Sequence, residues 1–173
     1  MSDGSIGNGP AGPPQPAQAG APPQGQQILV NAQYIKDLSF ENPRAPHSLR
    51  QPAGPPSVDI NVDVRAQGLG PDMFEVILTI NAGAKVQDEQ LFLVELAYGA
   101  VVTVRNVPQE LLSPIVLVET PRLIFPFARN IIADTTRDGG FAPLLINPID
   151  FADLLRRKNA AAAAGDAAAG ATL

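Results

Sequence analysis

Cysteine and tryptophan are absent from the 173 residues of this chain, and histidine occurs once, at His47. Without cysteine the chain can form no disulfide, thiol nucleophile or zinc–thiolate site, and this absence fits a reducing compartment. Nothing around the lone histidine indicates the nucleophile and acid of a catalytic triad. The sequence also has neither a P-loop nor a dinucleotide-binding glycine motif. These absences argue against an enzyme, and they predict no cofactor and no hydrolysis of a nucleotide.

Basic residues are few as well, because 12 Lys and Arg against 17 Asp and Glu leave a net charge of −5. A protein that binds nucleic acid needs a basic face for the phosphates, so we expect no nucleic acid partner. The apolar runs are too short to span a bilayer, and the N-terminus lacks the basic region and apolar core of a secretory signal. We therefore expect a cytoplasmic protein, not inserted in a membrane, whose partners are basic or apolar.

Composition divides the chain into three regions. Residues 1–27 are rich in Pro, Gly, Ala and Gln and carry one charge, on Asp3. Such a segment cannot bury enough apolar surface to offset the entropy lost on ordering, so we predict a disordered arm. A polyproline-type docking arm for a partner stays an alternative. Residues 28–158 are expected to form the folded domain, and the Ala- and Gly-rich residues 159–173 a flexible tail.

In the first half of the domain, apolar residues recur with period two, which is typical of half-buried strands. Strands are predicted at 28–34, 58–64, 74–80 and 90–104. The run 58–64 alternates most cleanly, with one aliphatic and one polar face, and Ala82-Gly83 is a turn signal after the third strand. Four strands with no helix between them argue for an antiparallel sheet. The proline-rich connection 42–57 suits a crossover better than a tight hairpin.

After about residue 107 the apolar period becomes helical. One helix is predicted by the stripe Ile124, Phe125, Ala128, Ile131 and Ile132. Pro126 should start or kink that helix, and Asp138-Gly139-Gly140 should end it. A last helix is expected from Asn147, with asparagine as N-cap and Pro148 in the first helical position. The fold class is therefore α+β, a four-stranded antiparallel sheet followed by two helices.

The carboxylates show no catalytic pairing. Asp59 and Asp63 share one face of a strand about 13 Å apart, which is too far for a retaining glycosidase pair, so a solvated face is the preferred reading. Asp37 and Glu41 also share one face of a strand, because they are an even number of residues apart. Glu95 interrupts an apolar run, and because burying a lone charge is costly it must reach the surface or a partner.

Four motifs in order along the chain resemble the SecB family, the bacterial chaperones that hold exported proteins unfolded. The motifs are Lys36–Pro43, Ala45–His47, Phe125–Arg129 and Asn147–Phe151. The resemblance covers residues 28–158 without large gaps. It implies a homotetramer built as a dimer of dimers, with the helix around 121–138 between the sheets. Oligomerisation also fits the fourth strand, which is apolar on both faces and needs cover on both.

The resemblance implies an ATP-independent chaperone that holds newly made precursor proteins unfolded in hydrophobic grooves and delivers them to the SecA motor ATPase. Family position and exposed apolar faces together suggest these client-binding residues: Val58, Ile60, Val62, Phe151 and Leu155. Plain core positions remain the alternative for them. Family position alone suggests this SecA-docking surface: Asp37, Glu41, Leu93 and Glu95. The zinc of the family belongs to the tail of SecA, and this chain has no ligand set for a metal.

Two other classes of function stay open at the level of sequence. One is a purely structural oligomerisation domain, in which the acidic face and the groove are incidental. The other is a small-molecule binding domain that uses the same apolar cavity. A chaperone slows the refolding of an unfolded protein at stoichiometric amounts, whereas neither alternative does.

Overall fold

The computed structural model describes residues 25–50 and 54–170, with the backbone alone for residues 165–170. Nearly all of the predicted N-terminal arm, 1–27, lies outside the described residues. The elements in chain order are β1 (Gln27–Glu41), the 3-10 turn η1 (His47–Leu49), β2 (Ser57–Gly70), β3 (Met73–Val86), β4 (Glu89–Arg105), α1 (Gln109–Pro114), the π-helical turn η2 (Ile115–Glu119), α2 (Thr120–Asp138) and α3 (Phe151–Gly170).

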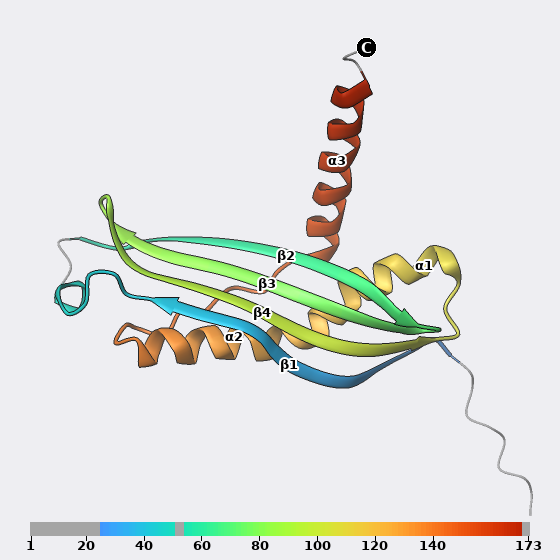
Figure 1. Ribbon diagram of the computed structural model, residues 1–173, viewed down its shortest axis with the longest axis horizontal. Coiled ribbons are helices and arrows are strands. Elements are labelled where there is room, and N and C mark those ends of the chain that lie inside the picture. Colours follow the sequence, from blue (N-terminus) through green and yellow to red (C-terminus); the bar gives the residue numbers. More distant parts are fainter. Residues whose placement is uncertain (1–24, 51–53, 171–173) are drawn as a thin grey trace, which may run out of the picture.

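The four strands form one antiparallel sheet in the order β1-β4-β3-β2 (Figure 1), as the alternation predicts. The connection between β1 and β2 crosses from one edge of the sheet to the other, which confirms the predicted crossover. The turn expected at Ala82-Gly83 is wrong, because β3 continues to Val86. Ala82 is 1% exposed, so a small side chain here fits close packing rather than a turn.

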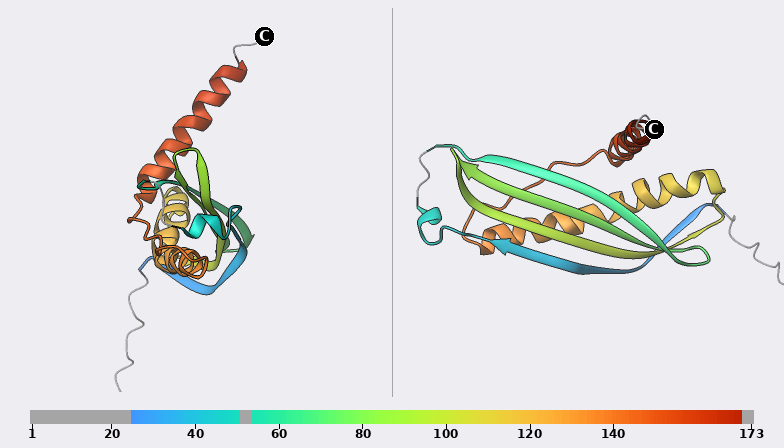
Figure 2. Two further views of the ribbon diagram at one scale, coloured as in Figure 1. Left: turned by 90° about the vertical axis from the view of Figure 1, so that its left-hand side faces the viewer. Right: turned by 45° about the horizontal axis from the view of Figure 1, so that its top comes forward.

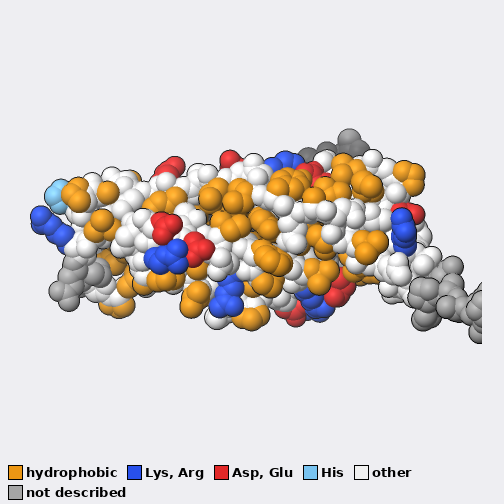
Figure 3. Space-filling model, turned by 90° about the horizontal axis from the view of Figure 1, so that it is seen from below, with side chains coloured by type: hydrophobic (Ala, Val, Ile, Leu, Met, Phe, Trp, Pro, Cys, Tyr) orange, Lys and Arg blue, Asp and Glu red, His pale blue; other side chains and the backbone are white. Residues whose placement is uncertain are grey.

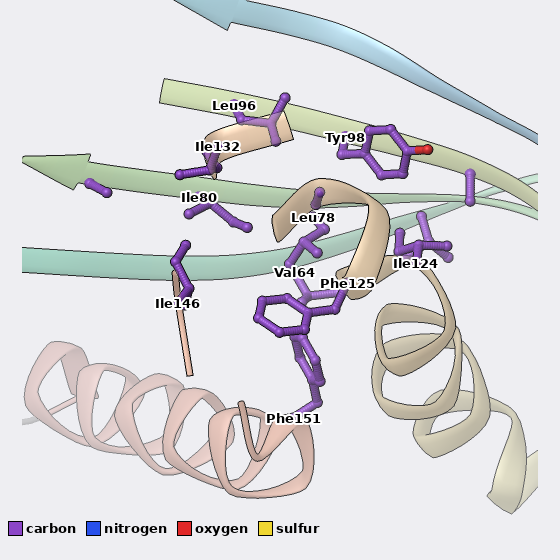
Figure 4. Close-up of a cluster of buried hydrophobic side chains, with 14 of the residues drawn as sticks. Val64, Leu78, Ile80, Leu96, Tyr98, Ile124, Phe125, Ile132, Ile146 and Phe151 are labelled. Atoms are coloured by element: carbon purple, nitrogen blue, oxygen red, sulfur yellow. The ribbon is translucent and has the colours of Figure 1, made fainter. Parts of the chain in front are cut away.

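One face of the sheet, here called the inner face, packs against the helices, and Figure 2 shows the sheet curving around α2. Even-numbered residues of β3 and β4 supply the buried side, as the fully buried Leu78, Ile80 and Leu96 show. They meet Ile124 and Ile132 of α2 in one cluster (Figure 4). Within the part of the chain that the structure describes, no helix covers the opposite face, here called the outer face.

The helical half contains one helix more than the pattern predicts. Residues Gln109–Asp138 form one helical stretch of 30 residues, long and apolar enough by composition to cross a membrane. Its apolar side instead lies in the core, where Val116, Val118 and Ile124 are buried. The π-helical turn η2 joins α1 to α2, and α2 runs through Pro126 rather than starting there. The predicted end at Asp138 is confirmed, and Gly140 follows with φ +90°, a conformation suited to glycine.

The last helix starts later than predicted. It begins at Phe151, and the Asp150 side chain, not Asn147, caps it by accepting hydrogen bonds from the backbone N–H groups of residues 152 and 153, both at 3.0 Å. Asn147 cannot cap this helix because three residues separate it from the first helical residue. The helix runs to Gly170 and projects from the body (Figure 1).

Candidate peptide-binding groove and docking face

The inner face of β2 is only partly covered because β2 is an edge strand. Val58 and Ile60 are each 42% exposed, and Val62 is half-buried. Their partners on β3 are small or fully buried, and α2 packs against β3 and β4 instead of β2. The three β2 side chains that the sequence suggests for client binding therefore form an apolar strip along an open edge, here called the β2 strip.

The β2 strip ends where α3 begins. The Lys158 Nζ donates hydrogen bonds to Asp63 Oδ1 at 2.7 Å and to the Val64 carbonyl oxygen at 2.8 Å. Partial burial has the largest single effect on the pKa of Asp63 and raises it. The hydrogen bonds and charges of Lys158 and Arg65 together outweigh burial, so the pKa of Asp63 is lowered. These contacts hold the first turns of α3 against the edge of β2, so the strip is open only from residue 57 to 62.

At its other end the β2 strip meets an apolar cavity of about 450 Å³. The cavity lies between the crossover, β2, the start of β4 and the connection from α2 to α3. Its apolar lining includes Leu49, Val58, Leu91, Phe92, Phe141 and Leu144. A strip and a cavity that share Val58 make one continuous groove, wide enough for a large side chain at the cavity end.

Phe92 and Phe141 in the lining of this cavity belong to an aromatic cluster with Phe40. The centroid of the Phe92 ring lies 5.9 Å from that of Phe40 and 5.0 Å from that of Phe141. The packing depends on Gly139, because a Cβ there would overlap the ring of Phe40. No pattern in the sequence marked Leu49, Phe92, Phe141 and Leu144 as residues of this groove. The apolar run after Gly139-Gly140 is the one signal that could have indicated the connection.

The two groove residues suggested on α3 lie elsewhere. Phe151 is 1% exposed and packs edge-on against Phe125, with ring centroids 5.9 Å apart (Figure 4). This side chain is sealed from solvent in this arrangement, so its contact with a client stays a prediction. Leu155 is half-buried against the same core cluster, so only part of its surface faces the solvent.

The four residues suggested for SecA docking come together on the outer face. Glu41 pairs with Leu93, Ser39 with Glu95 and Asp37 with Ala97 across β1 and β4. The three carboxylates are exposed and Leu93 is half-buried. None of these carboxylates forms an ion pair with another described residue. Two adjacent strands thus present an acidic patch around one aliphatic side chain, here called the docking face, whose role stays a prediction.

Metal-binding side chains do not gather at either surface within the described residues. Among the described residues there is no group of three or more His, Asp or Glu side chains that could hold a metal ion. His47 lies exposed in η1 and lines neither the cavity nor the docking face. The arrangement can bind through apolar contact and charge.

Comparison with known proteins agrees with the motifs. The family model described as "Preprotein translocase subunit SecB" matches residues 21–162. The chain belongs to the SecB family. The protein-export protein SecB of Afipia carboxidovorans is 51% identical over 144 residues, 83% of this chain and 88% of that protein. SecB of Parvibaculum lavamentivorans is 49% identical over 169 residues, 98% of each chain.

A solved SecB-like chaperone of Mycobacterium tuberculosis, in complex with a ChAD peptide from an antitoxin, has a similar fold. Its TM-score is 0.59 at 15% identity, over 70% of this chain and 90% of that one. At that identity the likeness concerns the fold alone. SecB proteins are protein-export chaperones and not enzymes, which agrees with the absence of a catalytic pattern in this sequence.

Proposed function

We propose that this SecB-family protein holds newly made precursor proteins unfolded in the cytoplasm, without ATP, and delivers them to the SecA export motor. The observation that carries the proposal is the open groove formed by the β2 strip and the cavity beside it. Val58 and Ile60 each expose 42% of their surface there, and the cavity that Val58 enters has a mostly apolar lining. Contiguous exposed apolar surface on a soluble protein typically marks a binding site.

The groove suits an extended apolar chain of any sequence. Each contact is worth about 25 cal/mol per Å² of apolar area removed from water, less the cost of ordering the client. Several weak sites on one assembly would add up through effective concentration. A folded protein has already buried its apolar segments, so it would compete poorly. The difference in exposed apolar surface would let the groove select non-native chains without recognising a particular sequence.

Holding should be measurable without any knowledge of the natural clients. A stoichiometric amount of the protein should slow the refolding of a chemically denatured test protein, with no nucleotide present. An unchanged refolding rate would rule out the chaperone function and favour a structural module. A compact ligand that copurifies with the protein, combined with an unchanged refolding rate, would favour a small-molecule binding domain.

Assembly as a homotetramer, a dimer of dimers, is part of the proposal. Leu123 and Phe127, one turn apart on α2, are 49% and 52% exposed on the side away from the sheet. Figure 3 shows hydrophobic side chains gathered along the face where α2 and β1 lie. β1 is also an edge strand, with Leu29 47% and Ile35 48% exposed. Unpartnered edges and apolar stripes of this kind are usually covered in an assembly.

Phe127→Asp should therefore break the assembly. A charge on the apolar stripe would have to be buried without a partner at the interface, which is costly. Light scattering should give a mass of four chains for the wild type and a smaller mass for the variant. Leu145→Asp is the matched control because Leu145, 64% exposed, lies outside α2. A monomeric wild type, or a Phe127→Asp variant that stays tetrameric, would contradict the proposed assembly.

Delivery is proposed to use the docking face, because an acidic patch meeting a basic partner gains complementarity and encounter rate. Asp37→Ala combined with Glu95→Ala should weaken SecA binding by about tenfold or more, while refolding of a test client is still slowed. Titration against SecA measures the first effect. Glu110→Ala combined with Asp138→Ala removes the same charge from exposed helical positions and should bind normally. Unchanged affinity of the Asp37/Glu95 variant would remove the docking proposal.

A further inference from the structure

A buried carboxylate lies on the outer face, which no described helix covers. Glu75 of β3 is only 7% exposed. Its oxygens accept hydrogen bonds from Tyr34 and Lys36 of β1 and from Gln67 of β2, with Lys36 Nζ at 2.9 Å. These bonds, that from Tyr34 first, lower the pKa of Glu75. One ionised side chain therefore ties β1 and β2 to β3 on the outer face; we name these four residues the Glu75 network.

The Glu75 network depends on a close approach across β4, which lies between β1 and β3. Tyr34 pairs with Gly99 of β4, and its ring lies over that residue: a Cβ at Gly99 would stand 2.6 Å from the Tyr34 ring. Only glycine leaves the phenol this path to Glu75. The contact between β1 and β3 is thus built into the sheet.

The same stretch of β1 contains a β-bulge. Ile35 pairs with Tyr98 and Asp37 with Ala97, so Lys36 is the extra residue. In a regular strand Tyr34 and Asp37, three positions apart, would point to opposite faces. The bulge shifts the alternation by one, so that both lie on the outer face. Every acidic residue of β1 in the docking face, Asp37 and Glu41, follows this bulge.

Hydrogen bonds, not tight packing, constrain the bulge. An open hollow of about 390 Å³ lies beside Lys36, Gln67 and Glu75, so neighbouring side chains do not wedge Lys36 in place. Among the described residues, Lys36 forms an ion pair with Glu75. We therefore expect the position of Lys36 in the bulge to depend on its ion pair with Glu75.

We propose that Glu75 is the positioning residue of the docking face: by holding Tyr34 and Lys36 it fixes the bulge that turns Asp37 and Glu41 toward the partner. The inference rests on the proposed delivery to SecA. Glu75 is too buried to touch the partner, so it acts through the β1 carboxylates. It also lies outside the four residues that sequence and family position suggest.

Glu75→Gln tests this role, because it keeps the size of the side chain and removes the charge that binds Lys36 and Tyr34. SecA affinity, measured by titration, should fall about tenfold, as expected for loss of a charge-assisted hydrogen-bond set. Holding of an unfolded client should be unchanged because the groove lies on the inner face. Glu110→Gln makes the same chemical change on exposed α1 and should bind SecA like the wild type.

A spectroscopic readout separates positioning from general packing. The hydrogen bond to Glu75 raises the pKa of Tyr34 to about 12, since the nearby carboxylate disfavours the phenolate. Tyr34 and Tyr98 are the 2 tyrosines of the chain, so a Tyr98→Phe background isolates Tyr34. At pH 11 its ultraviolet absorbance should indicate about one tenth phenolate, rising to about nine tenths in Glu75→Gln if its pKa returns to about 10.

The outcomes are distinguishable. If Glu75→Gln and Glu110→Gln bind SecA equally while the wild type also binds, the positioning role is wrong and delivery stands. If the wild type does not bind SecA, delivery and positioning both fail. If Glu75→Gln loses client holding together with docking, or leaves the ionisation of Tyr34 unchanged, Glu75 is an ordinary structural residue and the inference is overturned.

Discussion

Ile60→Asp should abolish client holding while the protein stays folded. Ile60 is 42% exposed in the middle of the β2 strip, so the aspartate can reach water and the free energy of unfolding should change by less than about 1 kcal/mol. A bound client, however, would bury that charge. Losing the burial of an isoleucine side chain is worth about 1.5–3 kcal/mol, or about ten- to a hundredfold in affinity at each groove.

The measurement is the refolding rate of a denatured test protein with equimolar chaperone. The variant should leave that rate as it is without chaperone, because the loss recurs at every groove of the assembly. Asn61→Asp is the matched control: it places the same charge one residue along β2, on the outer face. If Ile60→Asp unfolds the protein, as urea titration would reveal, Ile60 is a core residue; if holding persists, the β2 strip is not the binding surface.

Phe151→Ala should produce the largest loss of stability, about 3–5 kcal/mol in the free energy of unfolding. Phe151 is 1% exposed and fills the space between the start of α3 and Phe125 of α2. Its removal leaves a cavity that the edge-on partner cannot fill by itself. The loss should also loosen the first two turns of α3, which the contacts of Lys158 otherwise hold against β2.

Urea unfolding at one fixed protein concentration measures this effect, because assembly makes stability depend on concentration. Leu145→Ala, at a position that is 64% exposed, is the control and should change stability by less than about 0.5 kcal/mol. Unchanged stability of Phe151→Ala combined with weaker client binding would restore the sequence-based expectation that Phe151 contacts clients.

The fold was largely predictable because its information is local. Alternation in residues 58–64 needs only the period of a strand, and the crossover follows from a proline-rich connection that cannot form a tight hairpin. The local pattern gave a wrong prediction where residues typical of a turn or a helix cap have a different role in the packed structure. Ala82-Gly83 resembles a turn but fits a crowded strand, and Asn147-Pro148 resembles a cap although Asp150 supplies it.

The candidate sites divide in the same way. Parity along β1 placed Asp37 and Glu41 on one face, and the structure adds that Leu93 and Glu95 of β4 lie beside them. That neighbourhood depends on the pairing of strands more than 50 residues apart along the chain, which no local period encodes. Phe151 and Ile60 looked alike as apolar positions, although one is sealed and the other open.

Periodicity and composition decide on their own that this chain forms strands and then helices and carries a net negative charge. Which apolar side chains stay open to solvent is decided only when the elements pack, because exposure depends on what lies opposite each residue. The position of α2 leaves the edge of β2 uncovered, and the bulge at Lys36 shifts the alternation of the acidic residues that follow it. Both are consequences of contacts between distant segments.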